Sequence, residues 1–329
     1  MSEYKKIHGI HIQALASDPS NLGAGQVWYN TTSNQLKITA VSTSGAWASG
    51  GNMATTRRGL GGAGTQTAGL AFGGDTPTLS PNITNVTEHY DGSAWTAGGN
   101  MATASIRPGG AGTQTAGLAF GGLGPSFFNA TEHYDGSAWT AGGNMATARY
   151  RLGGTGTQTA GLAFGGSKSG IPSKSFIAEE YDGSAWTTGG TMGTSSSAVD
   201  AVGAGTQTAG LAFAHSPNGN ATEEYDGSTW TAGGNMATPD RYESAGAGTQ
   251  TAGLGFGGYQ GQGATNATEH YDGSAWTAGG NMATGRGSLG GCGADTSGLA
   301  FGGNDYNNTV NATEEYAGPG ITTQTVTSS

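Results

Sequence analysis

The sequence predicts an all-β protein that folds as a β-propeller, and the main observation behind this prediction is an internal repeat. Six tryptophans recur in nearly the same words at steps of 48, 44, 47, 44 and 46 residues. A period in the mid-forties is typical of one four-stranded propeller blade. The repeat tryptophans are Trp47, Trp95, Trp139, Trp186, Trp230 and Trp276.

Each copy divides into four short strands. The first holds a segment like RLGGTGT, the second holds TAGLAFGG, the third is NATEHYD and the fourth is SAWTAGG, which carries Trp139. Alternation along NATEHYD places Glu132 and Tyr134 on one face and His133 on the other. Asp135-Gly136 then predicts a hairpin turn, because Asp-Gly tolerates positive φ.

The two ends of the array are incomplete in complementary ways. The first copy has Trp47 without a preceding Tyr-Asp-Gly, and the last has Tyr316 without a following Trp. We therefore expect residues 41–317 to form a six-bladed ring in which an N-terminal strand closes the last blade. Closure of this kind removes the open sheet edges of a linear array.

The repeat also resembles a known family. An Arg after a Met, an apolar run ending in Gly-Gly, then Tyr and Trp in order resemble the kelch repeat over about residues 45–317. The resemblance implies a kelch-like propeller, a group that includes copper oxidases of the galactose oxidase type. Such a site needs converging Tyr, His and Cys, which a single cysteine, Cys292, and scattered histidines do not supply. We expect no catalytic residue, metal or cofactor.

Composition and charge disfavour several classes of protein. The formal net charge of −10 disfavours nonspecific binding of nucleic acid. The chain has 65 glycines, which alone would lean toward low complexity, but the repeat outweighs this. With one cysteine, no internal disulfide is expected, and Cys292 stands where other copies have Ala or Thr, so we expect a small buried residue. We expect neither a secretory leader nor a membrane span.

Residues 1–40 stand outside the repeat and predict a small β-hairpin. Gln26–Asn30 and Gln35–Thr39 are β-prone and flank a four-residue loop. This segment, GQVWYNTTSNQLKIT, resembles stretches near the N-termini of bacteriophage tail fibres, and YDGSAWTAGGNMATAR resembles virion proteins of marine and cyanobacterial phages. The resemblance implies attachment to the virion through the apolar hairpin residues Val27, Trp28, Tyr29, Leu36 and Ile38. Residues 318–329 form a polar tail that either adds a strand or frays.

Variation between copies predicts which side of the ring binds a ligand. Strand parity puts the loops joining strand four to one and strand two to three on one side, and these loops vary, whereas Gly-Thr-Gln-Thr and Tyr-Asp-Gly-Ser on the other side recur. Variable loops on a rigid scaffold are a common way to build a binding surface; the alternative is drift in tolerant loops. The predicted binding residues are Arg57, Arg58, Arg107, Phe127, Phe128, Arg149, Tyr150, Arg151, Lys168, Lys174, Phe176, Arg241, Tyr242, Tyr259, Arg286 and Tyr306.

Recurring acid–histidine pairs, such as Glu88/His89 and Glu132/His133, are better explained by structure than by catalysis. Adjacent strand residues point to opposite faces, and other copies have Glu-Glu instead. The sequence therefore favours a non-enzymatic phage virion protein that binds a host-surface glycan or protein through its variable loops, contacts other virion proteins through residues 1–40, and either is monomeric or forms a homo-oligomer. The alternatives are a purely structural decoration protein, or a carbohydrate-active enzyme, which would need paired carboxylates that no motif predicts.

Overall fold

The computed structural model describes residues 12–20, 23, 25–42, 44–77, 82–170, 174–193, 199–214, 219–261 and 263–326. The chain divides into two compact units: residues 46–317 form one, and residues 1–45 together with 318–329 form the other. All regular elements of the described residues are β-strands, which confirms the predicted class. No helix in this part of the chain has the length and apolar character needed to cross a membrane.

The larger unit contains six four-stranded antiparallel sheets in the described ranges, one for each repeat. Sheet 1 holds β5 (Gly61–Thr65), β6 (Ala68–Phe72), β7 (Thr87–Tyr90) and β8 (Trp95–Ala97). Sheet 2 holds β9 (Gly109–Thr113), β10 (Ala116–Phe120), β11 (Thr131–Tyr134) and β12 (Trp139–Ala141). Sheet 3 holds β14 (Gly153–Thr157), β15 (Ala160–Phe164), β17 (Ile177–Tyr181) and β18 (Trp186–Thr191).

The next three sheets repeat this plan. Sheet 4 holds β19 (Val202–Thr206), β20 (Ala209–Phe213), β21 (Thr222–Tyr225) and β22 (Trp230–Ala232). Sheet 5 holds β24 (Ala245–Thr249), β25 (Ala252–Phe256), β28 (Thr268–Tyr271) and β29 (Trp276–Ala278). Sheet 6 holds β30 (Gly290–Ala294), β31 (Ser297–Phe301) and β32 (Thr313–Ala317), and its fourth strand is β4 (Ala46–Ser49), which precedes all the others in sequence.

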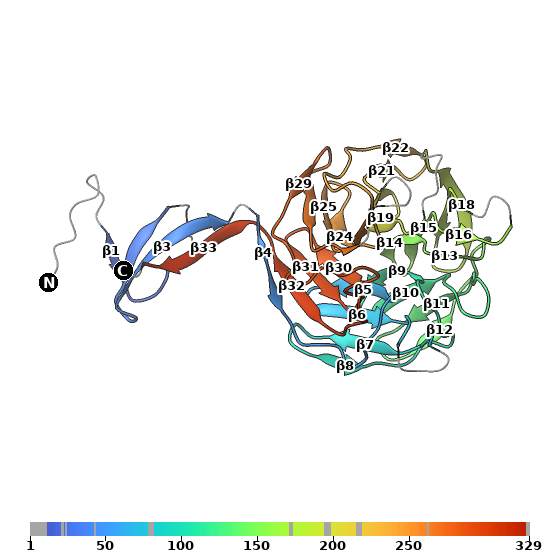
Figure 1. Ribbon diagram of the computed structural model, residues 1–329, viewed down its shortest axis with the longest axis horizontal. Helices are drawn as coiled ribbons and strands as arrows, with labels where there is room; N and C mark the ends of the chain where they lie inside the picture. The colour runs from blue at the N-terminus through green and yellow to red at the C-terminus, as the bar shows by residue number, and fades with distance from the viewer. Residues whose placement is uncertain are drawn as a thin grey trace. The chain divides into compact units, whose positions relative to one another are not determined.

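The first strand of each sheet lies nearest the centre of this unit (Figure 1). These first strands contact one another in chain order, from β5 through β9, β14, β19 and β24 to β30, and β30 in turn contacts β5. Their glycines allow the close approach: a Cβ on Gly110 would lie 2.6 Å from the carbonyl oxygen of Gly62. β4 pairs antiparallel with β32, with Trp47 opposite Tyr316.

Aromatic residues form the core between neighbouring sheets. The ring of Trp139 packs edge-on against Phe72 of the preceding sheet at 5.1 Å and against Tyr134 of its own sheet at 4.9 Å. Trp47 makes the same contacts with Phe256 and Tyr316, so it takes the place of the tryptophan that the last repeat lacks. A buried Leu, Phe and Met from each repeat complete these clusters.

The recurring polar residues link sheets to one another. The residue after the strand-three glutamate bonds the tyrosine hydroxyl of the next sheet, either through histidine, as in His133 Nε2 to Tyr181 Oη at 2.7 Å, or through glutamate, as in Glu180 Oε1 from Tyr225 Oη at 2.5 Å. All six sheets have such a link. The acid–histidine pairs therefore act structurally, as the sequence indicates.

The tryptophan indoles show how a change in one repeat leaves a polar atom unpaired. Five of them donate to a threonine hydroxyl at the start of strand three, as Trp139 Nε1 does to Thr87 Oγ1 at 2.9 Å. Trp230 Nε1 is buried and has no partner. The acceptor is missing because sheet 3, which precedes the sheet of Trp230, has Ala178 at the position where the other sheets have threonine.

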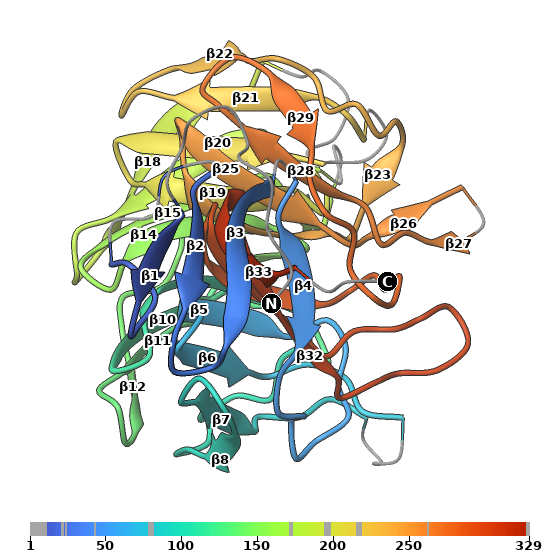
Figure 2. The ribbon, with the colours of Figure 1, turned by 90° about the vertical axis from the view of Figure 1, so that its left-hand side faces the viewer.

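The smaller unit is one four-stranded sheet built from both ends of the chain (Figure 2). β2 (Val27–Asn30) and β3 (Gln35–Ser42) form the predicted hairpin, with Val27 opposite Ile38. β1 (Gln13–Leu15) pairs parallel with β2, and β33 (Gly320–Thr325) pairs antiparallel with β3. The predicted division into residues 1–40, 41–317 and a separate tail is therefore wrong: residues 41–45 and the C-terminal strand belong to the smaller unit.

Candidate functional site

The two kinds of variable loop meet on one side of the larger unit, which we call the loop face. In sheets 3 and 5, short strands outside the four-stranded sheet pair the two loops with each other. β13 (Arg149–Tyr150) pairs with β16 (Ser167–Lys168). β23 (Arg241–Tyr242) pairs with β26 (Tyr259–Gln260), which also pairs with β27 (Gly263–Ala264). Isolated bridges join the same loops in sheets 1, 2 and 6. The predicted grouping of the four-to-one and two-to-three loops is confirmed in these sheets.

Four of the predicted binding residues are not on the surface. The side chains of Arg57, Arg149, Arg241 and Arg286 are 0% exposed, and each forms an ion pair of 2.9–3.3 Å with the buried strand-three glutamate of its own sheet. Arg149, for example, also donates to the carbonyl oxygens of Gly165 and Ile177. The prediction that these four arginines contact a ligand is wrong, because they lie inside the fold as internal cross-links.

Burial alone would make these guanidinium groups costly, so their partners explain why they remain charged. Burial lowers the pKa of Arg57, Arg149 and Arg241 to about 10, while the neighbouring glutamate raises it. Each arginine therefore stays a cation at neutral pH. The same glutamate accepts backbone N–H groups of the loop before the inner strand, as Glu88 does from Ala54 at 2.7 Å, so the pair fixes that loop to its sheet.

The residue two positions before the start of each inner strand stands at the centre of the loop face. The six equivalent residues, which we call the axial ring, line one pocket of about 120 Å³. All six have φ between +52° and +62°, although five are not glycine. Positive φ is costly for such residues and concentrates at functional sites. The axial ring comprises Gly59, Arg107, Arg151, Asp200, Glu243 and Ser288.

Backbone hydrogen bonds hold this conformation around the pocket. The amide of Arg107 donates to the carbonyl of Gly59 at 2.6 Å, and the amide of Gly59 donates to Ser288 at 2.7 Å. The same link joins Arg151 to Arg107, Asp200 to Arg151 and Ser288 to Glu243. The side chains of the axial ring therefore start from a backbone that is fixed in place.

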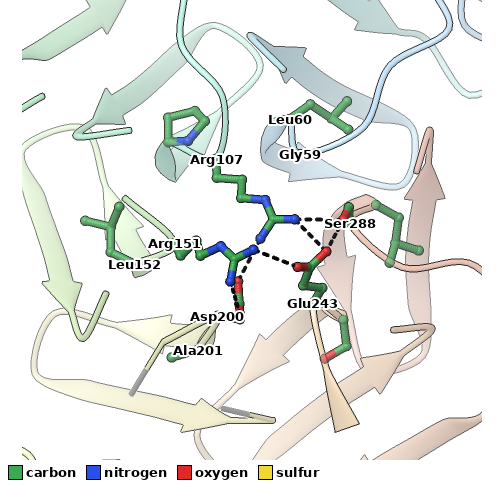
Figure 3. A pocket seen from close by; sticks show the side chains of 12 residues that line it. Gly59, Leu60, Arg107, Arg151, Leu152, Asp200, Ala201, Glu243 and Ser288 are labelled. Atoms are coloured by element: carbon green, nitrogen blue, oxygen red, sulfur yellow. Dashed lines mark hydrogen bonds and ion pairs between the residues drawn. The ribbon is translucent and has the colours of Figure 1, made fainter. Parts of the chain in front are cut away.

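Figure 3 shows that the charged side chains of the axial ring meet over the pocket. Asp200 accepts from Arg107 at 3.1 Å and from Arg151 at 3.2 Å. Glu243 pairs with the same two arginines at 2.6 and 3.2 Å and also accepts from the Ser288 hydroxyl. The two cations and two anions balance one another, so the pocket is strongly polar but has no net charge.

The electrostatics of this cluster depend on its burial. The side chains of Asp200 and Glu243 are 6% and 9% exposed, whereas that of Arg151 is 31% exposed. Burial raises the pKa of Asp200 to about 6, and the two arginines oppose the shift. Asp200 therefore changes its charge in weakly acidic solution, where an ordinary aspartate stays ionised.

Aromatic side chains stand around the axial ring in two groups. Phe127 stacks on Tyr150 with ring centroids 5.1 Å apart, and Arg151 lies 5.6 Å from the Tyr150 ring. Tyr259 contacts both Tyr242 and Tyr306, and Tyr306 is 57% exposed. The structure thus brings these predicted residues together on the loop face.

The remaining predicted cations lie on the same loops but differ in their surroundings. Arg58 is 45% exposed and pairs with Asp75 at 3.0 Å. Lys168, Lys174 and Phe176 are partly exposed on the two-to-three loop of sheet 3, and Phe128 is partly buried beneath the loop of sheet 2. Because Arg58, Arg107 and Arg151 all have acidic partners, the loop face is not the strongly basic surface that the positions of the cations alone suggest.

The centre of the unit offers no reactive group of its own in the described residues. Below the axial ring, the Gly-Ala-Gly segments of the inner strands line a cavity of about 200 Å³. Cys292 is one of its small lining residues, and burial raises the pKa of its thiol to about 12, which disfavours a nucleophilic thiolate. No group of three or more His, Cys, Asp or Glu able to hold a metal ion occurs among the described residues.

The hairpin residues predicted to attach the chain divide between two faces of the small sheet. Val27 and Tyr29 lie directly opposite Ile38 and Leu36, so these four share one partly exposed face. Trp28 lies on the other face, is 1% exposed, and donates from Nε1 to Asp18 at 3.0 Å. The prediction that Trp28 contacts a partner is wrong, because it forms the core of its own unit.

The sequence analysis missed three polar members of the axial ring: Asp200, Glu243 and Ser288. They are separated by 43 and 45 residues and share no motif. The signal lay in their repeat position, which stands two residues before the inner strand and carries five residue types in six copies. Apart from Gly59, the position stays polar while its residue type varies beside a nearly constant strand, and this pattern indicates a surface position rather than part of the scaffold.

Comparison with known proteins identifies the fold and nothing finer. No family model matches the chain, and no curated protein matches its sequence. The solved structure of YjhT matches with a TM-score of 0.66 at 12% sequence identity, over 83% of this chain and 99% of that one. The larger unit of this protein has a β-propeller fold.

Proposed function

We propose that this chain is a non-enzymatic virion protein of a bacteriophage that binds the host surface through its loop face. The single observation that carries the binding role is the axial ring, where five non-glycine residues with positive φ gather at one pocket. Elsewhere the repeat keeps almost the same residues from copy to copy, so most of the variation between sheets lies on the loop face. The virion assignment rests on the resemblance of the hairpin and of the repeat wording to phage structural proteins.

The loop face suits recognition of a neutral or zwitterionic polar group, such as part of a surface glycan or protein. The two arginines of the axial ring offer donors, its two carboxylates offer acceptors, and the aromatic pairs beside it offer flat apolar surface. Aromatic residues and Arg are frequent anchors in binding interfaces. Several copies per particle would strengthen weak contacts of this kind.

The smaller unit would join the chain to other virion proteins. Its partly exposed apolar face, formed by Val27, Tyr29, Leu36 and Ile38, is the surface that we assign to this contact. Immunogold electron microscopy of purified particles tests the location: label at tail or fibre tips supports host binding, and label over the head favours a decoration protein. Unlabelled particles would contradict the virion assignment altogether.

The binding role has a separate test on purified protein. The double variant Phe127→Ala/Tyr150→Ala removes one aromatic pair of the loop face, and we expect at least a tenfold weaker binding to host cells. Thr159→Ala, an exposed change in the β14–β15 turn on the opposite side, is the matched control and should bind like the wild type. Equal binding of both variants would contradict the loop-face assignment.

We also infer that the propeller is kelch-like and six-bladed, with β4 as the outer strand of the last blade. The antiparallel pairing of β4 with β32 and the contact between β30 and β5 support this inference. Trp47 is partly buried against the core of the last blade, so Trp47→Ala should lower the free energy of unfolding by about 2–3 kcal/mol, less than the cost for a fully buried tryptophan. A loss below about 1 kcal/mol, as for an exposed residue, would contradict closure through β4.

One observation favours a second function, a carbohydrate-active enzyme. Asp200 and Glu243 face the same pocket, and the pKa of Asp200 is raised to about 6, as a general acid requires. Both carboxylates are, however, held by Arg107 and Arg151, which favours a structural or binding role. Release of sugars from host glycans by the wild type, abolished in Asp200→Asn, would establish the enzyme and overturn the non-enzymatic proposal.

A further inference from the structure

Sheet 2 departs from the buried arginine–glutamate pairs of sheets 1, 3, 5 and 6. Ser105 takes the place of the arginine, and it is 1% exposed. The strand-three glutamate remains: Glu132 is 5% exposed and accepts the amides of Ala102 at 2.8 Å and Thr103 at 3.0 Å. Among the described residues, no Arg, Lys or His lies within ion-pair distance of Glu132.

A small cavity remains beside Glu132 where the other sheets place the guanidinium group. Its volume is about 10 Å³, which is the space of one water-sized sphere, and Ser105, Gly121, Phe128 and Ala130 line it together with Glu132. The amide of Phe128 donates to Gly122 as that of Thr265 donates to Gly258 in sheet 5, so the two residues are equivalent. The larger Phe128 side chain therefore fills part of the space that the missing arginine leaves.

The oxygen atoms that bind the guanidinium in the other sheets are all present around this cavity. In sheet 5, Arg241 donates to the carbonyls of Gly257 and Ala267 and to Glu269. The equivalent atoms in sheet 2 are the carbonyls of Gly121 and Ala130 and the Glu132 carboxylate. The Ser105 hydroxyl adds a fourth oxygen and donates to the Gly121 carbonyl at 3.4 Å. In the four sister sheets the corresponding two carbonyls and carboxylate hold the guanidinium cation of an arginine side chain.

We propose that the cavity beside Glu132 is a binding site for a monovalent cation, either potassium or ammonium. A single carboxylate calls for a single positive charge, and the oxygen donors suit hard cations and ammonium alike. A guanidinium group is too large for one water-sized space, and a divalent calcium or magnesium ion would leave an excess positive charge beside the single buried carboxylate. Because Phe128 lines the cavity and adjoins Phe127, the bound cation would also steady the loop that places Phe127 against Tyr150.

Thermal unfolding of the full chain in different chloride salts at equal ionic strength tests this site. Potassium and ammonium chloride should raise the midpoint for the wild type by about 1–3 °C over tetramethylammonium chloride, whose cation is too large to enter. Ser105→Arg/Phe128→Thr restores the internal guanidinium, so its midpoint should not depend on the cation. Glu132→Gln removes the charge and should also lose the dependence.

An identical midpoint of the wild type in all three salts, or an equal shift in the restored variant, would overturn the proposal and leave a cavity that holds water. Should a variant fail to fold, anomalous diffraction from wild-type crystals soaked in rubidium decides the matter. A rubidium peak beside Glu132 supports the site, and a map without one overturns it.

Discussion

Arg149 and Arg151 are two residues apart on one loop, yet the structure places them in opposite surroundings. Arg149 is fully buried against Glu179 and two carbonyls, whereas Arg151 reaches the axial pocket with 31% of its side chain exposed. The same contrast separates Arg57 from Arg58. One set of arginines holds the loops to the sheets, and the other contributes to the surface that those loops build.

The largest effect that follows from this contrast is expected for Arg149→Ala. It leaves the Glu179 carboxylate buried without its cation, and such a loss typically costs about 3–5 kcal/mol of unfolding free energy. Denaturant titration of the purified protein measures it. The matched double variant Arg149→Met/Glu179→Gln removes both charges and should recover most of the loss; an equal loss in both variants would show that the ion pair is not what Arg149 contributes.

The pH dependence of stability tests the burial of Asp200, the acidic partner of Arg151 in the axial ring. Its folded-state pKa of about 6 lies above the ordinary value of 3.8, so the folded state binds its proton more tightly than the unfolded state does. The free energy of unfolding should therefore decrease as pH rises from about 4 to about 6, by about 1–3 kcal/mol relative to Asp200→Asn. Unfolding curves of the two proteins across this range measure the difference.

A difference of opposite sign would show that the two arginines outweigh burial at Asp200. The comparison with Asp200→Asn is needed because the turn aspartates change stability in the other direction. Asp91, for example, has a lowered pKa, caused by hydrogen bonds from Ala94 and Ser93. Such groups titrate alike in both proteins and cancel in the difference.

The smallest effect is expected for Arg58→Ala. Arg58 pairs with Asp75 but is 45% exposed, and exposed ion pairs contribute about 0–1 kcal/mol. The neighbouring Arg57→Ala serves as its control, because it should cost several times more for the same change one residue earlier. Similar losses in these two variants would remove the distinction between buried and surface arginines.

Much of the fold could be predicted because the repeat carries its own signals. The period, the Asp-Gly turn and the paired incomplete ends predicted four strands per copy and the pairing of β4 with Tyr316. The strand β33 could not be placed, since GITTQT is compatible with either a strand or a frayed end, and its partner β3 is nearly the whole chain away. Pairing over such a distance leaves no local pattern.

The site was harder to predict for a geometric reason. A loop arginine can point into the fold or toward solvent, and the acceptors near it decide which. Arg149 points inward because Glu179 and the carbonyls of Gly165 and Ile177 accept its hydrogen bonds there. A sign was present, in that the arginine recurs at one repeat position alongside a constant strand-three glutamate. Which members of the axial ring meet has no such sign, because Arg107 and Asp200 come from different sheets, 93 residues apart, and only the packing of the sheets brings them together.

The most direct test of the account compares Arg149→Ala and Arg151→Ala in two measurements, thermal unfolding and binding to host cells. We predict that Arg149→Ala unfolds at a clearly lower temperature, whereas Arg151→Ala, in which Arg107 still pairs with both carboxylates, loses less stability and binds cells at least tenfold more weakly. Undiminished binding by a stable Arg151→Ala protein would contradict the claim that the loop face, centred on the axial ring, is the binding surface.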